Sequence, residues 1–197
     1  MAHPTERSTR PPLALQRYAF FLAPSEYRVT DGDTLSVSTY NEHGARLRFR
    51  IRLSSTNAPE MPRAEMMDDF WLKNGIDPNQ DCPGTRAAKM LADAMAGKPI
   101  LVVPAIQQNS NVIDRYNRLL ADVYFSGPNP VAEAASPETK GFDFDGYQNV
   151  SRFMFAAGQC RLMPGKSLPS PTNPVLEQMK SRLGNEQLAP ASFEHYT

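Results

Sequence analysis

The sequence has little of several features that would place it in a common class of protein. It has only two cysteines in 197 residues, Cys82 and Cys160, and their spacing matches no metal-binding motif. We expect two free thiols, with a single disulfide as the alternative. His3, His43 and His195 lie far apart in the sequence, so it supports neither a histidine metal cluster nor a histidine-based catalytic triad.

An excess of charge of one sign and a long apolar run are also missing. Twenty-one basic residues balance 21 acidic ones, so any affinity for a polyanion must come from local clusters of charge. The apolar stretch LALQRYAFFLAPS is interrupted by Gln16 and Arg17 and is too short to span a bilayer. It also lacks the arrangement of a signal peptide. We therefore expect a cytoplasmic, monomeric protein without membrane association.

The length and the 41% hydrophobic content suit one domain with a packed core. We expect a flexible N-terminal tail over residues 1–14, a folded domain over 15–163, and a C-terminal linker, weak helix and tail over 164–197. Within the domain, residues 126–146 form a long loop rich in Pro, Gly and Asp. No internal repeat divides the chain further.

Short strands dominate the elements that the sequence predicts. β-forming residues fill 17–23 and 27–30, and 35–40 alternates apolar and polar side chains. Further strands are expected at 99–104 and 119–125, and helices at 61–73, 85–96, 149–158 and 174–183. Strands in this order with few helices predict an α+β fold, mainly β, built around a small closed barrel.

The most unusual stretch is RLRFRIRL, residues 46–53, which follows a turn signal and completes a hairpin with 35–40. Successive side chains of a strand point to opposite faces. One face therefore carries Arg46, Arg48, Arg50 and Arg52, and the other Leu47, Phe49, Ile51 and Leu53. The arginine face is either an ordinary solvated surface or a phosphate-handling surface with an acid or base, Glu60, beyond its end.

Two acidic motifs resemble calcium loops but lack their key residues. The motif DGDT, residues 31–34, lies between two expected strands and by itself indicates a turn. Leu35 and Ser36 stand where an EF-hand needs an acidic or amide side chain and a glycine. FDFDG, residues 142–146, has Met154 at the position of the bidentate glutamate, so we expect a solvated loop there.

Taken in order, DGDT, RLSSTNAPE, GTRAA, DRYNRLLADVY and NVSRFMFAAG resemble the staphylococcal nuclease (thermonuclease) family over about residues 27–163. The resemblance implies an OB-fold, a five-stranded β-barrel with about three helices. It also implies Ca²⁺-dependent hydrolysis of phosphodiesters in DNA and/or RNA with little sequence specificity.

The resemblance assigns a role to each matching position. Glu60 becomes the general base, and Arg52 and Arg118 clamp the phosphate. Planar guanidinium groups suit this task because each can bind two phosphate oxygens at once. The metal ligands are Asp33, Asn57 and the carbonyl oxygen of Ala58. The supporting residues are Asp31, Thr34, Asp114 and Tyr116.

One of these positions departs from the family pattern. Asn57 stands where the family has a second metal-binding aspartate, so one negative charge is missing and we expect weaker Ca²⁺ binding. Carboxylates on the helix expected at 61–73 could compensate: Glu65, Asp68 and Asp69. Asn57 and the zero net charge favour an alternative, a nuclease-like module that binds nucleic acid or a protein without turnover. An unrelated small-molecule-binding barrel is a third hypothesis.

Overall fold

The computed structural model describes residues 11, 13–41, 43–61, 82–105, 112–126, 142–171 and 173–186. The helix expected at 61–73, most of the loop expected at 126–146, and most of both tails lie outside these residues. Within them the protein is an α+β structure in which strands predominate, as the sequence predicts.

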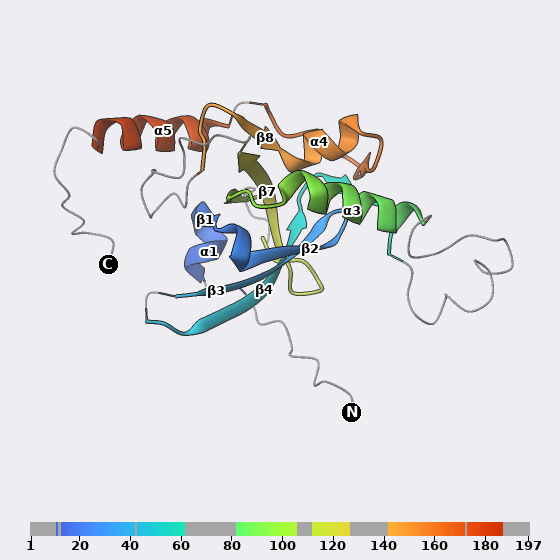
Figure 1. Ribbon diagram of the computed structural model, residues 1–197, viewed down its shortest axis with the longest axis horizontal. Coiled ribbons are helices and arrows are strands. Elements are labelled where there is room, and N and C mark those ends of the chain that lie inside the picture. Colours follow the sequence, from blue (N-terminus) through green and yellow to red (C-terminus); the bar gives the residue numbers. More distant parts are fainter. Residues whose placement is uncertain are drawn as a thin grey trace, which may run out of the picture.

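Seven strands form one mixed sheet in the order β1-β6-β7-β4-β3-β2, with β8 paired to β7 (Figure 1). They are β1 Phe20–Leu22, β2 Tyr27–Asp31, β3 Thr34–Tyr40, β4 Arg46–Leu53, β6 Ile100–Pro104, β7 Leu119–Ser126 and β8 Tyr147–Asn149. Among the strands that the structure describes, only β4 and β7 pair in parallel. Two shorter strands, β5 Thr56–Asn57 and β9 Arg161–Leu162, pair separately. The strands at 27–30, 35–40, 46–53, 99–104 and 119–125 are thereby confirmed.

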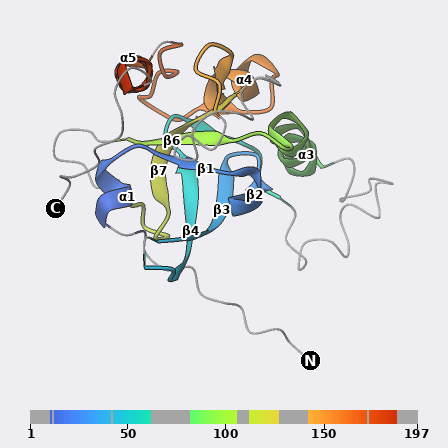
Figure 2. The ribbon, with the colours of Figure 1, turned by 60° about the vertical axis from the view of Figure 1, so that its left-hand side comes forward.

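The helices lie around this sheet (Figures 1 and 2). They are α1 Leu13–Arg17, α3 Pro83–Met95, α4 Val150–Ala156 and α5 Pro174–Glu186, together with the 3₁₀ turn η1 Pro24–Glu26. The helices expected at 85–96, 149–158 and 174–183 correspond to α3, α4 and α5. Gly97 and Gly158 follow α3 and α4 with positive φ angles of 67°, as expected for glycines that end a helix.

The number of strands in the sheet differs from the expected five. The edge strands β1 and β2 are neighbours in sequence, separated by η1, yet among the described residues no strand pairing joins them. The sheet is therefore not closed by hydrogen bonds into a barrel there. Pro24 at the start of η1 interrupts what would otherwise be one bent strand, because its ring fixes φ and removes a donor.

The strand expected at 17–23 is only partly present. Residues 13–17 form α1, and the strand is limited to Phe20–Leu22. The sequence LALQR consists of strong helix formers, whereas the two phenylalanines favour a strand. Local propensity therefore divides this apolar segment into a helix, 13–17, and a short strand, 20–22.

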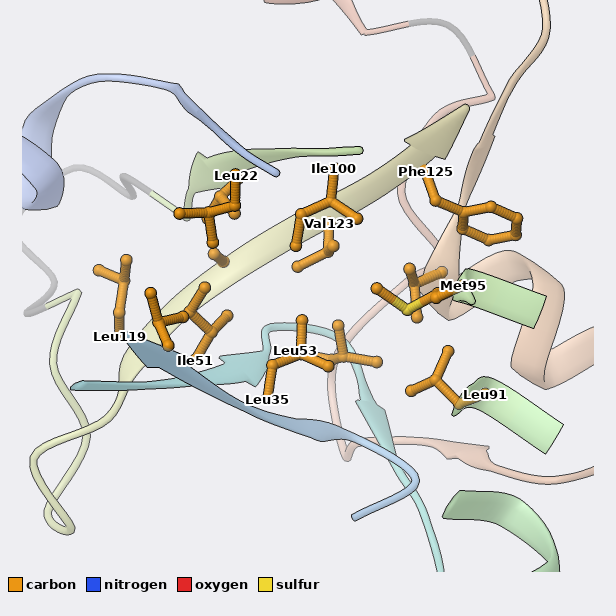
Figure 3. Close-up of a cluster of buried hydrophobic side chains, with 14 of the residues drawn as sticks. Leu22, Leu35, Ile51, Leu53, Leu91, Met95, Ile100, Leu119, Val123 and Phe125 are labelled. Atoms are coloured by element: carbon orange, nitrogen blue, oxygen red, sulfur yellow. The ribbon is translucent and has the colours of Figure 1, made fainter. Parts of the chain in front are cut away.

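The hairpin of β3 and β4 has the predicted alternation. Phe49, Ile51 and Leu53 are buried on the inner face, and Arg46 at the far end is exposed. Figure 3 shows that Ile51 and Leu53 belong to the same cluster of buried side chains as Leu91 and Met95 from α3, with Ile51 beside Leu119. Val150 and Met154 of α4 join the same cluster. Burial of these apolar side chains is the main force that holds both helices on the sheet.

A second cluster covers the outer face of the sheet where β1, β6 and β7 lie. Its buried members are Leu101, Tyr124, Phe142 and Leu176, the last from α5. The expectation of a solvated loop at 142–146 is therefore wrong for Phe142, because the neighbouring aromatic rings provide an apolar environment for it. Asp145 of the same loop is exposed and pairs with Lys180 on α5.

The two cysteines are free thiols, as expected, with Cys82 buried and Cys160 partly buried. Within the described part of the chain, no helix combines the length and the apolar character needed to cross a membrane.

Tyr27 of β2 fixes the end of α3 by hydrogen bonds that can be tested. Its hydroxyl lies 2.9 Å from the Met95 carbonyl oxygen and 2.6 Å from that of Lys98. Tyr27→Phe should lower the free energy of unfolding by ~1 kcal/mol, because two partly buried carbonyls lose their donor. Urea unfolding at neutral pH measures this loss, and Tyr18→Phe at an exposed position is the control.

The difference in stability between wild type and Tyr27→Phe should also change with pH. Burial raises the pKa of Tyr27 to about 12 from 10.0. The unfolded chain therefore loses this proton first, and wild-type stability should fall as pH rises from about 10 to 12. Tyr27→Phe lacks this proton, so its deficit relative to wild type should shrink over that interval. A deficit that stays constant would contradict the assignment.

Candidate active site

The DGDT motif forms the turn between β2 and β3, and Asp33 is its buried member. Only 3% of Asp33 is exposed. Its Oδ1 accepts a hydrogen bond of 3.0 Å from the hydroxyl of Thr34, and its Oδ2 accepts one of 2.6 Å from the backbone N–H of Ala58. The carboxylate thus ties this turn to the NAPE segment, residues 57–60, which is 25 positions further along the chain.

Arg52 connects the same two segments from the end of β4. The register of β3 and β4 sets Arg52 opposite Thr34, so its side chain lies beside the turn. Nη1 forms an ion pair with the Asp33 carboxylate and lies 3.3 Å from the Asp33 carbonyl oxygen. Nη2 donates a hydrogen bond to Oδ1 of Asn57. Arg52 is itself buried, so these contacts fix its orientation.

The NAPE segment is held in place from its other side by α4 and β9. Thr56 is fully buried, and its hydroxyl bonds to that of Ser151 on α4 at 3.1 Å. Asn57 pairs with Arg161 in the short β5–β9 ladder. These contacts leave Glu60 exposed at the end of the segment. The carboxylate is therefore accessible to a water molecule or a substrate.

Two glycines let the backbone segments of the site approach closely. A Cβ on Gly32 would lie 2.7 Å from Cβ of Ala58 and 2.8 Å from Cβ of Ala87 on α3. A Cβ on Gly84 would lie 2.1 Å from the carbonyl oxygen of Glu60. All three distances are shorter than non-bonded atoms allow, so α3 can pack this closely against the site only because residues 32 and 84 have no side chain.

The motif DRYNR, residues 114–118, forms a tight turn before β7. Oδ1 of Asp114 accepts the backbone N–H groups of Tyr116 at 2.8 Å and of Arg118 at 2.9 Å. Asn117 has a φ of 62°, a left-handed conformation that asparagine tolerates better than most residues. Because β7 runs parallel to β4, this turn lies next to the middle of β4, close to Arg52.

Arg118 is oriented by three contacts. Its Nε donates to Oδ2 of Asp114 at 2.7 Å, its Nη1 lies 3.4 Å from the hydroxyl of Thr34, and its guanidinium lies 5.1 Å from the ring centroid of Tyr116. Arg115 lies 4.7 Å from the same ring. Tyr116 remains about half exposed, so its ring is also available to a ligand.

The carboxylates of the site influence one another. Burial raises the pKa of Asp31 to about 6, and the negative charges of Asp33 and Glu60 add to the rise, while Arg52 and a backbone hydrogen bond from Gly32 oppose it. Burial also acts against ionisation of Asp114, but hydrogen bonds from Arg118 outweigh it and lower the pKa of Asp114. Negative charge is therefore concentrated at the DGDT turn and the end of NAPE.

Two oxygen donors that could hold a hard cation lie on either side of Arg52, the Asp33 carboxylate and the Asn57 amide oxygen, and the Ala58 backbone carbonyl is a third donor in the same segment. The Arg52 guanidinium already lies between the first two as a cation, so this place accommodates positive charge. The donors fit a divalent metal if Arg52 releases them. Among the described residues, no group of three or more His, Cys, Asp or Glu side chains is arranged to hold a metal ion.

The structure brings the sequence-predicted site residues into one region. Seven of them lie in or beside the DGDT turn: Asp31, Asp33, Thr34, Arg52, Asn57, Ala58 and Glu60. Arg118 contacts Thr34 of this turn, and Asp114 and Tyr116 in turn contact Arg118. Glu65, Asp68 and Asp69 lie outside the described residues.

Sequence reasoning missed Gly32, Gly84, Ser151 and the β5–β9 pairing. A glycine in the first turn of a helix, as in PGTRAA, was a usable signal, because glycine there costs stability unless packing requires it.

Comparison with models of known protein families finds no match, and comparison with curated proteins finds none either. A functional assignment therefore depends on the chain's own residues.

The packing at Gly84 gives a test of how the site is supported. Gly84→Ala places a methyl group against the Glu60 backbone, which cannot move as freely as a side chain, so the free energy of unfolding should fall by ~1–3 kcal/mol. Ala92→Ser adds one atom on the exposed side of α3 and should change it by less than ~0.5 kcal/mol. Equal urea midpoints for the two variants would contradict the close packing.

Proposed function

We propose that the protein is a Ca²⁺-dependent phosphodiesterase that hydrolyses DNA and/or RNA with little sequence specificity. The observation that carries this proposal is that Arg52 and Arg118 both contact the DGDT turn: Arg52 pairs with Asp33 and bonds to Asn57, and Arg118 lies beside Thr34. Each guanidinium group is held by a carboxylate, Arg52 by Asp33 and Arg118 by Asp114, and the exposed carboxylate of Glu60 lies at the end of the neighbouring NAPE segment. A site that only packs the fold has no need of this combination.

In the proposed reaction Glu60 accepts a proton from water while the water oxygen bonds to phosphorus and one ester P–O bond breaks. The leaving oxygen takes up a proton from solvent. Arg52 and Arg118 bind the non-bridging oxygens, whose negative charge grows in the transition state. Arg118 is suited to this task because Asp114 and Thr34 hold its guanidinium in one orientation.

Bound Ca²⁺ would supply a Lewis acid that polarises a phosphoryl oxygen. Asp33, Asn57 and the Ala58 carbonyl would hold it. Arg52 binds the same oxygens of Asp33 and Asn57, so loading the site must release those contacts of Arg52. The released guanidinium N–H donors then become available to a phosphate.

We further propose that the fold is of the OB type. Three strands, β2, β3 and β4, form an antiparallel meander, β4 pairs in parallel with β7, and β7 pairs with β6. The two edge strands belong to one nearly continuous segment interrupted only by residues 23–26. This order of strands supports a barrel that is closed through the chain connection, with helix α3 against one end of the core.

A second candidate function is a nuclease-like module that binds nucleic acid or a protein without turnover. The observation that favours it is the buried ion pair of Arg52 with Asp33 together with the amide at Asn57. Arg52 is occupied, and the ligand set has one carboxylate fewer than a site with aspartate at 57. Both features would slow an enzyme but would not prevent binding.

Cleavage assays decide between the two functions. Labelled single-stranded DNA, duplex DNA and RNA are incubated with the protein in Ca²⁺ or in chelator. We expect Ca²⁺-dependent cleavage, with Glu60→Gln lowering kcat by ~10²–10⁴-fold because the general base is lost. Glu177→Gln removes the same charge from an exposed position on α5 and should be as active as wild type. Binding without cleavage under any of these conditions would support the module instead.

The amide at position 57 allows a separate test of the metal site. Asn57→Asp restores a second carboxylate, so Ca²⁺ affinity measured by calorimetry should rise by about tenfold or more, since affinity follows ligand charge. Asn41→Asp adds the same charge in the β3–β4 turn and should leave affinity unchanged. Equal affinity of Asn57→Asp and wild type would show that the charge argument is wrong.

A further inference from the structure

Three arginines of β4 are not used by the proposed chemistry. They are Arg46, Arg48 and Arg50, called the arginine row here, and they share one face of the strand with Arg52. Pairing with β3 sets Tyr40, Ser38 and Ser36 opposite them, and Arg28 of β2 lies beyond Ser36. The row therefore runs along the outer face of the hairpin and ends at the candidate active site.

This face carries no negative charge at its paired positions. The eight residues that β3 and β4 contribute between the Thr34–Arg52 and Tyr40–Arg46 pairs are four arginines, two serines, a threonine and a tyrosine. Glu26 accepts a hydrogen bond from the hydroxyl of Thr39, which lies on the opposite face. Neither strand of the hairpin contains an aspartate or a glutamate, so β3 and β4 contribute only positive charge to this face.

The row is also held in an ordered arrangement. Nε of Arg46 donates to the hydroxyl of Ser38 at 2.9 Å, and Nη2 of Arg50 donates to the Tyr116 carbonyl at 3.2 Å. The second contact joins the row to the turn that carries Arg118. Nε of Arg50 is buried without a hydrogen-bond partner, so one donor at the junction of the row and the site is unsatisfied.

We propose that the arginine row binds the sugar-phosphate backbone of a single-stranded nucleic acid on one side of the phosphate held by Arg52 and Arg118. This inference rests on the proposed function, because it uses that site as the end of the track. It adds the preferred form of the substrate, an extended single strand, and the direction in which the strand leaves the site.

The spacing of the row explains the preference for a single strand. Alternate residues of a strand are about 7 Å apart and lie in a nearly straight line. Phosphates of a duplex strand advance by only about 3.4 Å each along the axis while they wind around it, so a straight row soon loses contact with them. A flexible single strand can extend until its successive phosphates match the arginines.

Tyr40 lies at the far end of the row, opposite Arg46, with 66% of its surface exposed. An exposed aromatic ring beside a basic track is the usual partner for an unpaired base, which stacks on it without regard to sequence. A duplex has no unpaired bases to offer. Tyr40 therefore supports the same choice of substrate as the spacing of the arginines.

Binding is measured with a fluorescent dT12 oligonucleotide and a 12-base-pair duplex, in chelator so that no turnover occurs. The variant Arg46→Gln, Arg48→Gln, Arg50→Gln should bind dT12 about tenfold or more weakly than wild type at low salt. Its slope of log affinity against log salt should be smaller by about two, since each phosphate contact on a single strand contributes about 0.7.

A matched control removes the same charge from other elements: Lys89→Gln, Lys166→Gln, Lys180→Gln. It should keep both the affinity and the salt slope of wild type. Arg50 also contacts the 114–118 turn, so the double variant Arg46→Gln, Arg48→Gln tests the row without disturbing that turn. Its salt slope should be reduced by about two thirds of the reduction seen in the triple variant. Tyr40→Ala should weaken dT12 binding with no change in slope.

The outcomes separate this inference from the proposed function. Equal dT12 affinity for the triple variant and the lysine control would overturn the row as a binding track, even if Glu60-dependent cleavage is present. Tighter binding of the duplex than of dT12 by wild type would also overturn it. If the triple variant alone loses affinity for dT12 but wild type shows no Ca²⁺-dependent cleavage, the arginine row is a binding track and the proposed nuclease function is wrong.

Discussion

The buried ion pair between Asp33 and Arg52 is the contact on which the rest of the candidate site depends. Both side chains are withdrawn from water, and a buried charge without a partner costs several kcal/mol. Each residue therefore fixes the other, and the pair sets the position of the β2–β3 turn against the end of β4. Ala58 and Asn57 are tied to the same two side chains. The site is one coupled unit, so its members are not expected to contribute additively.

The parallel pairing of β4 and β7 supplies the second constraint. Parallel neighbours need a long crossover, and here the chain between them carries the NAPE segment, α3 and β6. The two strands overlap over only three residue pairs, 51–53 with 119–121, so the end of β4 lies beside the start of β7. Arg52 and Arg118, which are far apart in sequence, therefore lie close together in the middle of the sheet. α3 can pack closely against the site because Gly32 and Gly84 have no side chains there.

Much of this arrangement could be predicted from local patterns. The alternation in β4 identified both its faces, and Gly97 and Gly158 marked the ends of two helices because a positive φ favours glycine. That DGDT, Arg52, NAPE and DRYNR lie close together could be predicted only from the resemblance of these motifs to a known family, because no local pattern shows which distant segments are in contact. Strands as short as β5 and β9, and the contact of Thr56 with Ser151, give no periodic signal at all. The burial of Phe142 was missed because an aromatic cluster forms only in three dimensions.

The neutral charge of the chain does not conflict with binding a polyanion, because its charges are separated in space. Interactions between exposed charges are screened beyond about 8–10 Å at physiological salt, so a ligand senses mainly the face it approaches. On the outer face of the hairpin that local charge is the arginine row, whereas α3 and the loop at 142–146 carry acids such as Asp93 and Asp145. The acids near the site, Asp33 and Asp114, are engaged by Arg52 and Arg118. Under the proposed function, a nucleic acid would therefore meet positive charge first and carboxylates only near Glu60, the proposed general base.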